Sequence, residues 1–183
     1  IAEKRKQLKA EIIHQPYSGE FEERIYDVDS AWKSQFWAWI KFTDENGIEK
    51  VGQFRGFPKG VKVSKAKNEI IVLTSDCAFR LDSIELNLIE MEKQSDYGNI
   101  EVSPNGTFIF SEFSSIYKMG NSLSEMECIE SPFEMDLIEF KNWNGNILEF
   151  ECVEMRKYEK RENMQLDSVN WAIKPKKTHH NNV

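Results

Sequence analysis

Carboxylates are the residues of this chain whose number and spacing could do chemistry. Thirteen carboxylates and only two lysines, Lys93 and Lys118, lie between Asp82 and Glu139, so this segment carries a net charge of −11. A cluster of one sign repels itself, and its usual benefit is faster and more selective encounter with an oppositely charged surface. The segment therefore predicts a basic protein partner, and the alternative is that these charges only keep strand faces soluble.

The alternation of side chains predicts which of these carboxylates meet the partner. Glu125 and Glu127 alternate with Met126 and Cys128, and successive side chains of a strand point to opposite faces. We expect the binding surface to combine five acids with two tryptophans: Glu125, Glu127, Glu130, Glu134, Asp136, Trp37 and Trp39.

The tryptophans offer a second kind of recognition. Trp37 lies on the face of one short predicted strand opposite to Phe36, so large rings occupy both faces. Core packing is one interpretation, and the other is an exposed patch of the kind enriched at protein interfaces and on sugar-binding platforms. The alternative function is therefore a carbohydrate-binding or lectin-like β domain that uses Trp32, Trp37, Trp39 or Trp143.

Nucleophilic, metal and cofactor chemistry lack their motifs in this sequence. The histidines are His14, His179 and His180, and only the first lies outside the polar C-terminal tail. A Ser-His-Asp or Cys-His site needs a histidine held by a third group, and no phosphate-binding glycine loop, dinucleotide fingerprint, HExxH or CxxC occurs. We expect no enzyme, no cofactor and no metal. A third hypothesis, a carboxylate-pair enzyme, requires two acids of perturbed pKa facing each other in one cleft.

Charge and hydropathy also restrict the partners and the compartment. The net charge is −7, and lysine and arginine concentrate at the two ends of the chain, whereas a phosphate backbone needs a basic stripe. No apolar run approaches the roughly 20 residues that cross a bilayer. The cysteines Cys77, Cys128 and Cys152 are too widely spaced for a disulfide framework or a metal site. We therefore expect neither nucleic acid nor membrane as partner, and three buried free thiols in a cytoplasmic protein.

An acidic, β-rich chain without catalytic motifs resembles, in this general character, the small bacterial immunity proteins that neutralise a basic toxin. No motif carries the resemblance, so it assigns a role to no residue. It implies a cytoplasmic, non-catalytic protein that binds a basic protein partner.

Four segments of similar pattern predict the elements that must position these residues. They are IKFTDENG from Ile40, VKVSKAKNE from Val61, IEVSPNG from Ile100 and IEFKNWNG from Ile138. A second apolar run follows each one, which is typical of a β-hairpin, and Asn-Gly supplies the left-handed backbone of a tight turn. We expect such turns at Asn46-Gly47, Asn105-Gly106 and Asn144-Gly145.

The spacing of the copies predicts the fold class. The last three begin 39 and then 38 residues apart, close to the period of four-stranded propeller blades. A closed propeller needs at least about four blades, and the chain offers room for about three such units. We therefore predict a mainly β protein: an antiparallel hairpin meander that forms an open sheet, a sandwich or a partial propeller. The predicted single domain spans residues 1–175, with a short amphipathic helix over about 1–13 and a frayed tail over 176–183.

The predicted acidic surface makes association with a basic partner depend on salt. Replacing Glu125, Glu127 and Glu130 by lysine should slow association and leave the domain folded, because steering acts over the Debye length, which shrinks from about 30 Å at 0.01 M to about 8 Å at 0.15 M. Association kinetics across a salt series, with a partner isolated from the native host, measure this effect. An on-rate that ignores both salt and the triple substitution would show that the carboxylates serve solubility alone.

Overall fold

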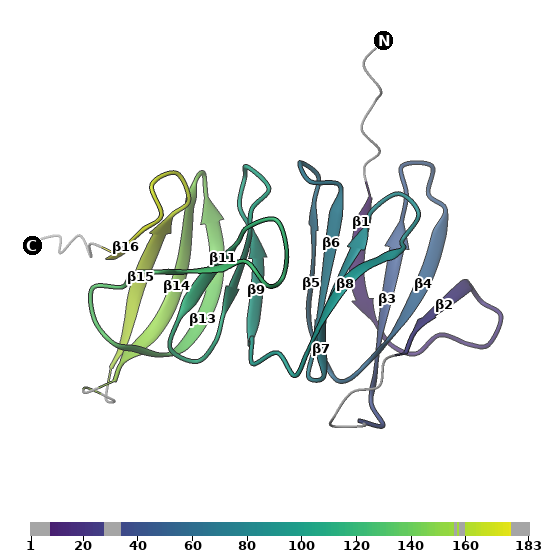
Figure 1. The fold of residues 1–183 in the computed structure, drawn as a ribbon, viewed down its shortest axis with the longest axis horizontal. Coiled ribbons are helices and arrows are strands. Elements are labelled where there is room, and N and C mark those ends of the chain that lie inside the picture. Colours follow the sequence, from purple (N-terminus) through teal and green to yellow (C-terminus); the bar gives the residue numbers. More distant parts are fainter. Residues whose placement is uncertain (1–7, 28–33, 156, 158–159, 177–183) are drawn as a thin grey trace, which may run out of the picture.

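The structure, a computed structural model, consists of four small β-sheets that stand in a row (Figure 1). It describes residues 8–27, 34–155, 157 and 160–176, which form sixteen strands. These residues contain no helix, and so none that could span a membrane.

Each sheet has four strands, and the sheets follow one another along the chain. Sheet A contains β1 (Lys9–Ile13), β2 (Glu22–Tyr26), β3 (Trp37–Thr43) and β4 (Glu49–Arg55). Sheet B contains β5 (Pro58–Ser64), β6 (Glu69–Thr74), β7 (Cys77–Asp82) and β8 (Leu88–Lys93). Sheet C contains β9 (Asn99–Val102), β10 (Phe108–Ser111), β11 (Ile116–Met119) and β12 (Met126–Ile129). Sheet D contains β13 (Met135–Asn144), β14 (Ile147–Glu154), β15 (Arg161–Asp167) and β16 (Ala172–Pro175).

Sheets B, C and D are simple antiparallel meanders, each in sequence order. Sheet A has the order β1-β3-β4-β2, and its edge strand β2 runs parallel to β4. The first strands of successive sheets, β1, β5, β9 and β13, contact one another in turn. Among the described residues no backbone pairing joins sheet A to sheet D. The described residues thus form four four-stranded units, where the sequence predicted about three.

Three apolar layers hold the sheets together, one between each pair of neighbours. Phe54 of sheet A and Phe79 of sheet B belong to the first layer. Sheets B and C share the second layer, and sheets C and D share the third. Strand β10 shows the consequence, because Phe108 and Phe110 face sheet B while Ile109 faces sheet D, and all three are fully buried. Strand β10 is therefore apolar on both faces.

The predicted hairpin repeat is confirmed. Gly47, Gly106 and Gly145 have positive φ angles of 79°, 90° and 59° in the turns β3–β4, β9–β10 and β13–β14. The segment from Val61 forms β5–β6, and Asn68 in its turn has φ 55°. The mainly β fold class is thus correct.

The predicted N-terminal helix is wrong for residues 9–13, which form β1, and residues 1–7 lie outside the described residues. Ala10 and Ile12 pair with Phe42 and Ile40 along β3. An isolated helix of about 13 residues is only marginally stable in water, so this pairing outweighs the helix preference of the segment. Of the predicted tail, residues 177–183 lie outside the described residues, and its first residue, Lys176, donates its N–H to the Asn163 carbonyl at 2.8 Å.

The cysteine prediction holds except for one position. All three cysteines are free, and Cys77 and Cys152 are buried. Cys128 is exposed, contrary to the prediction, because β12 is the edge strand of sheet C.

Two turn glycines form a matched test of how sheets B and C pack. Gly106→Ala would place a Cβ 2.5 Å from the Ala66 Cβ and 2.8 Å from the Ser64 Oγ, whereas Gly145→Ala meets nothing within 4 Å. Both substitutions carry the backbone strain of positive φ, about 1–2 kcal/mol. We expect Gly106→Ala to cost about 1–3 kcal/mol more, since it overpacks the contact between two sheets. Urea unfolding measures the difference, and equal losses would contradict this packing.

Candidate functional site

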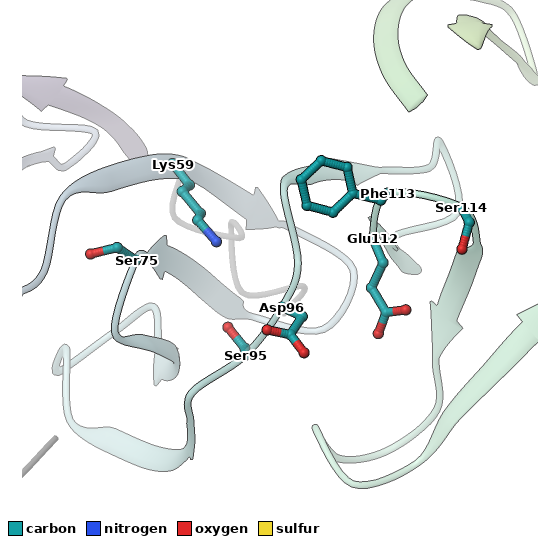
Figure 2. Close-up of a pocket in the computed structure, with 7 residues that line it drawn as sticks. All are labelled: Lys59, Ser75, Ser95, Asp96, Glu112, Phe113 and Ser114. Atoms are coloured by element: carbon teal, nitrogen blue, oxygen red, sulfur yellow. The ribbon is translucent and has the colours of Figure 1, made fainter. Parts of the chain in front are cut away.

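A cleft of about 380 Å³ opens where loops of sheets B and C meet, and Figure 2 shows its lining. Sheet B contributes Lys59 from β5 and Ser75 from the β6–β7 turn. The β8–β9 connection contributes Ser95 and Asp96. The β10–β11 loop contributes Glu112, Phe113 and Ser114. In this view Lys59 and Glu112 approach from opposite sides, with Asp96 between them.

Backbone hydrogen bonds fix the loops that form the cleft. The Gln94 N–H donates to the Asp76 carbonyl at 2.8 Å, and the Gly98 N–H donates to the Ser111 carbonyl at 2.7 Å. These two bonds anchor both ends of the segment that carries Ser95 and Asp96. The cleft is therefore built on paired backbone, which positions side chains more firmly than a free loop does.

Glu92 is a half-buried carboxylate beside this cleft. It pairs with Ala78 across β7 and β8, and because Ala78 belongs to the layer between sheets B and C, Glu92 faces sheet C. Its Oε2 is buried and has no hydrogen-bond partner in the described part of the chain. Burial raises the pKa of Glu92, and the nearby carboxylates Glu112, Glu90 and Asp96 raise it further. The negative charge of ionised Glu92 is therefore not balanced by a nearby cation within the described ranges.

Ser95 is the second unpartnered group, and it lines the cleft directly. Its side chain is 6% exposed, and its Oγ has no hydrogen-bond partner among the described residues. Buried polar atoms are usually hydrogen-bonded, so such an atom in a cleft wall suits a guest that brings a donor or acceptor.

Lys59 supplies a positive charge at the opposite side of the cleft. Its Nζ donates to the Tyr97 carbonyl at 2.7 Å. Burial lowers the pKa of Lys59, while the Asp96 carboxylate acts in the opposite direction. Glu112 accepts a hydrogen bond from the Tyr117 hydroxyl at 3.1 Å. The single positive charge of Lys59 thus faces three carboxylates, those of Asp96, Glu112 and the adjacent Glu92.

Exposed apolar side chains continue from the cleft on both sides. Phe113 is 71% exposed and also lines an adjoining hollow of about 260 Å³ that reaches Leu137 and Arg161. On the other side the exposed rings of Phe36 and Phe57 meet edge to face at 6.2 Å. Exposed aromatic groups around a polar centre are typical of surfaces that bind other proteins.

Several kinds of catalysis find no support in the described residues. Burial raises the pKa of the Cys77 and Cys152 thiols to about 11, which leaves little of the reactive thiolate at neutral pH. No group of three histidine, cysteine or acidic side chains among these residues could hold a metal ion. His14 is exposed.

The predicted acidic residues lie near the outer edge of sheet C and the start of sheet D. Glu125 accepts the Asn121 N–H at 3.0 Å in the β11–β12 turn, and Glu127 on β12 forms an ion pair with Lys118 at 3.0 Å. Glu130 and Glu134 are exposed in the β12–β13 connection, and Asp136 on β13 is half-buried.

Trp37 and Trp39 lie on β3 of sheet A, so sheet B separates them from these acids. Trp37 and Trp39 are half-buried on the face opposite Ala38, and the Arg55 guanidinium lies 4.1 Å from the centre of the Trp37 ring. Trp143 packs against the layer between sheets C and D, and Trp32 lies outside the described residues.

Sequence reasoning missed the residues that form the cleft. Glu92, Asp96 and Glu112 lie inside the acidic segment, but nothing in their spacing distinguishes them from its other carboxylates. The signal is structural, because stacking of sheets B and C brings the β8–β9 and β10–β11 loops together.

No family model matches the chain, and no curated protein matches it. Solved structures similar to it include the N-terminal domain of Nup159, with 13% identity and a TM-score of 0.46 over 67% of this chain and 35% of that one. Another is the Cps50 (Swd1) β-propeller domain of Myceliophteria thermophila, with 8% identity and a TM-score of 0.47 over 76% and 53%. The chain thus spans about a third to a half of these two structures. TM-scores below 0.5 establish neither a shared fold nor a shared function.

The raised pKa of Glu92 predicts how stability depends on pH. The folded state holds this proton more tightly than the unfolded state, so the contribution of Glu92 to stability is fully present below the unfolded pKa and is lost as pH rises through the folded pKa. Glu92→Gln should therefore raise the free energy of unfolding at pH 7 relative to wild type, and the gain should vanish near pH 4.

Urea unfolding at both pH values measures this gain, with Glu45→Gln in the β3–β4 turn as the control at an exposed carboxylate. A gain for Glu92→Gln that is the same at pH 4 and pH 7 would show that the charge of Glu92 is not the cause.

Proposed function

We propose that this protein is a non-catalytic protein-binding module and that its cleft receives a basic side chain of a partner protein. The uncompensated negative charge of the cleft carries the proposal. Glu92 Oε2 and Ser95 Oγ, both buried, have no hydrogen-bond partner among the described residues, and Asp96 and Glu112 stand beside them. A lysine or arginine head group offers both the charge and the donors that these groups lack.

The surroundings of the cleft support a protein partner over a free cation. Phe113 lines the cleft, the backbone of Phe57 is hydrogen-bonded to Ser75 of the cleft lining, and both rings are exposed. Aromatic anchors often supply most of the energy of a protein interface. The acidic segment from Asp82 to Glu139 adds a long-range field that favours approach of a basic surface. A basic toxin, as in an immunity-type role in the cytoplasm, is one partner of this chemistry.

Removal of two negative charges from the cleft tests whether the peptide binds there or at the acidic surface that contains Glu125 and Glu130. The probe is a seven-residue peptide, capped at both ends, in which valine alternates with lysine. Asp96→Asn with Glu112→Gln should raise the dissociation rate at least tenfold, a loss of about 1.4 kcal/mol, since both residues line the cleft and would contact the bound lysine directly. Surface plasmon resonance or stopped-flow anisotropy measures both rates.

The matched control is Glu125→Gln with Glu130→Gln, which also removes two negative charges, but from exposed positions outside the cleft. It should slow association and leave dissociation within about threefold, as expected for charges that only steer. Equal effects of the two double variants on dissociation would contradict a role for the cleft. Failure of the wild type to bind the peptide at low salt would refute the proposed function.

A further inference from the structure

Strand β8 differs from the other outer edge strands of this fold. Each sheet ends in one such strand: β2, β8, β12 and β16. Exposed edges recruit other strands, and proteins usually protect them with charge, shortness or proline. Strand β2 exposes Glu22, Glu23 and Arg24, β12 has four residues with Glu127 at its centre, and β16 has four residues and ends in Pro175.

Strand β8 has six residues and exposes apolar side chains. Leu88 is 41% exposed, Ile89 47% and Met91 36%. Glu90, Glu92 and Lys93 give it charge, but it is longer than β12 and β16 and contains no proline. Strand β2 exposes one large apolar side chain, Ile25, whereas β8 exposes three. Strand β8 is therefore the edge best suited to accept another strand.

The hydrogen bonding between β7 and β8 shows which backbone N–H groups of β8 point outward and could pair with another strand. The Gln94 N–H donates inward to the Asp76 carbonyl at 2.8 Å, and β7 and β8 pair as antiparallel strands. Backbone groups of a strand alternate in direction, so the N–H groups of Glu92 and Glu90 also point inward, while those of Met91 and Lys93 point outward.

The side chains of β8 indicate the chemistry of an added strand. Glu92 faces sheet C, whereas Met91 pairs with Phe79, a residue of the layer between sheets A and B, and faces the other way. Arg80 already neutralises Glu90 at 2.6 Å, so Glu92 is the acid that lacks a cation. The complementary segment places a basic residue beside Glu92 and apolar residues beside Met91 and Lys93.

The edge also leads into the cleft. Ser95 and Asp96 of the cleft wall follow two and three residues beyond Lys93. A segment paired with β8 therefore runs beside the acidic centre, and one interface joins the edge strand to the cleft.

We propose that the basic partner binds as an extended segment that adds antiparallel to β8, with apolar and basic residues in alternation. This inference rests on the proposed function and specifies its binding mode. Main-chain hydrogen bonds to Met91 and Lys93 hold the segment, and the basic side chain beside Glu92 gives the selectivity.

Backbone methylation of the valine–lysine peptide tests this mode. In the proposed register the valines lie opposite Met91 and Lys93, so their N–H groups point toward β8 and those of the lysines point away. Methylation of the valine nitrogens should weaken binding at least tenfold. Methylation of the lysine nitrogens should change it less than threefold, although the side chains and charges of both peptides are the same.

Variants of Met91 complete the test. Met91→Pro removes an outward N–H at an edge, a position where proline is tolerated, and should weaken binding at least tenfold, while Met91→Ala keeps the N–H and should weaken it less. Peptide addition should also slow hydrogen exchange at the Met91 and Lys93 amides. If Met91→Pro unfolds the protein, the methylated peptides on the wild type decide the result.

The outcomes separate the two proposals. If binding requires Asp96 and Glu112 but methylation of the valine nitrogens does not weaken it, strand addition is overturned and the cleft proposal stands. Absence of binding by every peptide would overturn both.

Discussion

Burial of both faces of the inner sheets is the constraint on which this structure depends. Three apolar layers hold four sheets together, and sheets B and C must contribute to two layers each. Strand β6 shows how strict this is, since five of its six residues are buried. Because strand interiors are thereby committed to packing, polar groups gather in the loops and along the outer edge strands. The loops supply all of the cleft lining except Lys59 of β5.

The same constraint explains why Glu92 is unusual. It lies on the edge strand of sheet B, on the face that continues the layer between sheets B and C, so it is partly removed from water without gaining a cation. Its neighbour Glu90 shares that face and is neutralised by Arg80, which also binds Glu69. A charge left uncompensated in such a place destabilises the free protein and is available to stabilise a complex.

Local sequence signals predicted the hairpins, because a turn such as Asn105-Gly106 requires a left-handed backbone that few residues adopt. They could not predict β1, whose helix-forming residues 9–13 are held by pairing with β3. The sequence predicted about three four-stranded sheets instead of four because β1 and β2 of sheet A lack a clear alternating apolar pattern. The acidic segment was found, but the cleft within it was not, since Asp96 and Glu112 meet only through contacts between sheets. The search for exposed carboxylates favoured Glu125 and Glu127 over the half-buried Glu92.

The central claim is that a basic group of the partner compensates the charge at Glu92. Carbon-13 NMR titration of the Glu92 carboxyl group, in the free protein and with the valine–lysine peptide at saturation, tests it most directly. The account predicts that the pKa of Glu92 is raised in the free protein and falls on binding, because a nearby cation favours the ionised form. A pKa that stays the same when the peptide is bound would contradict the account.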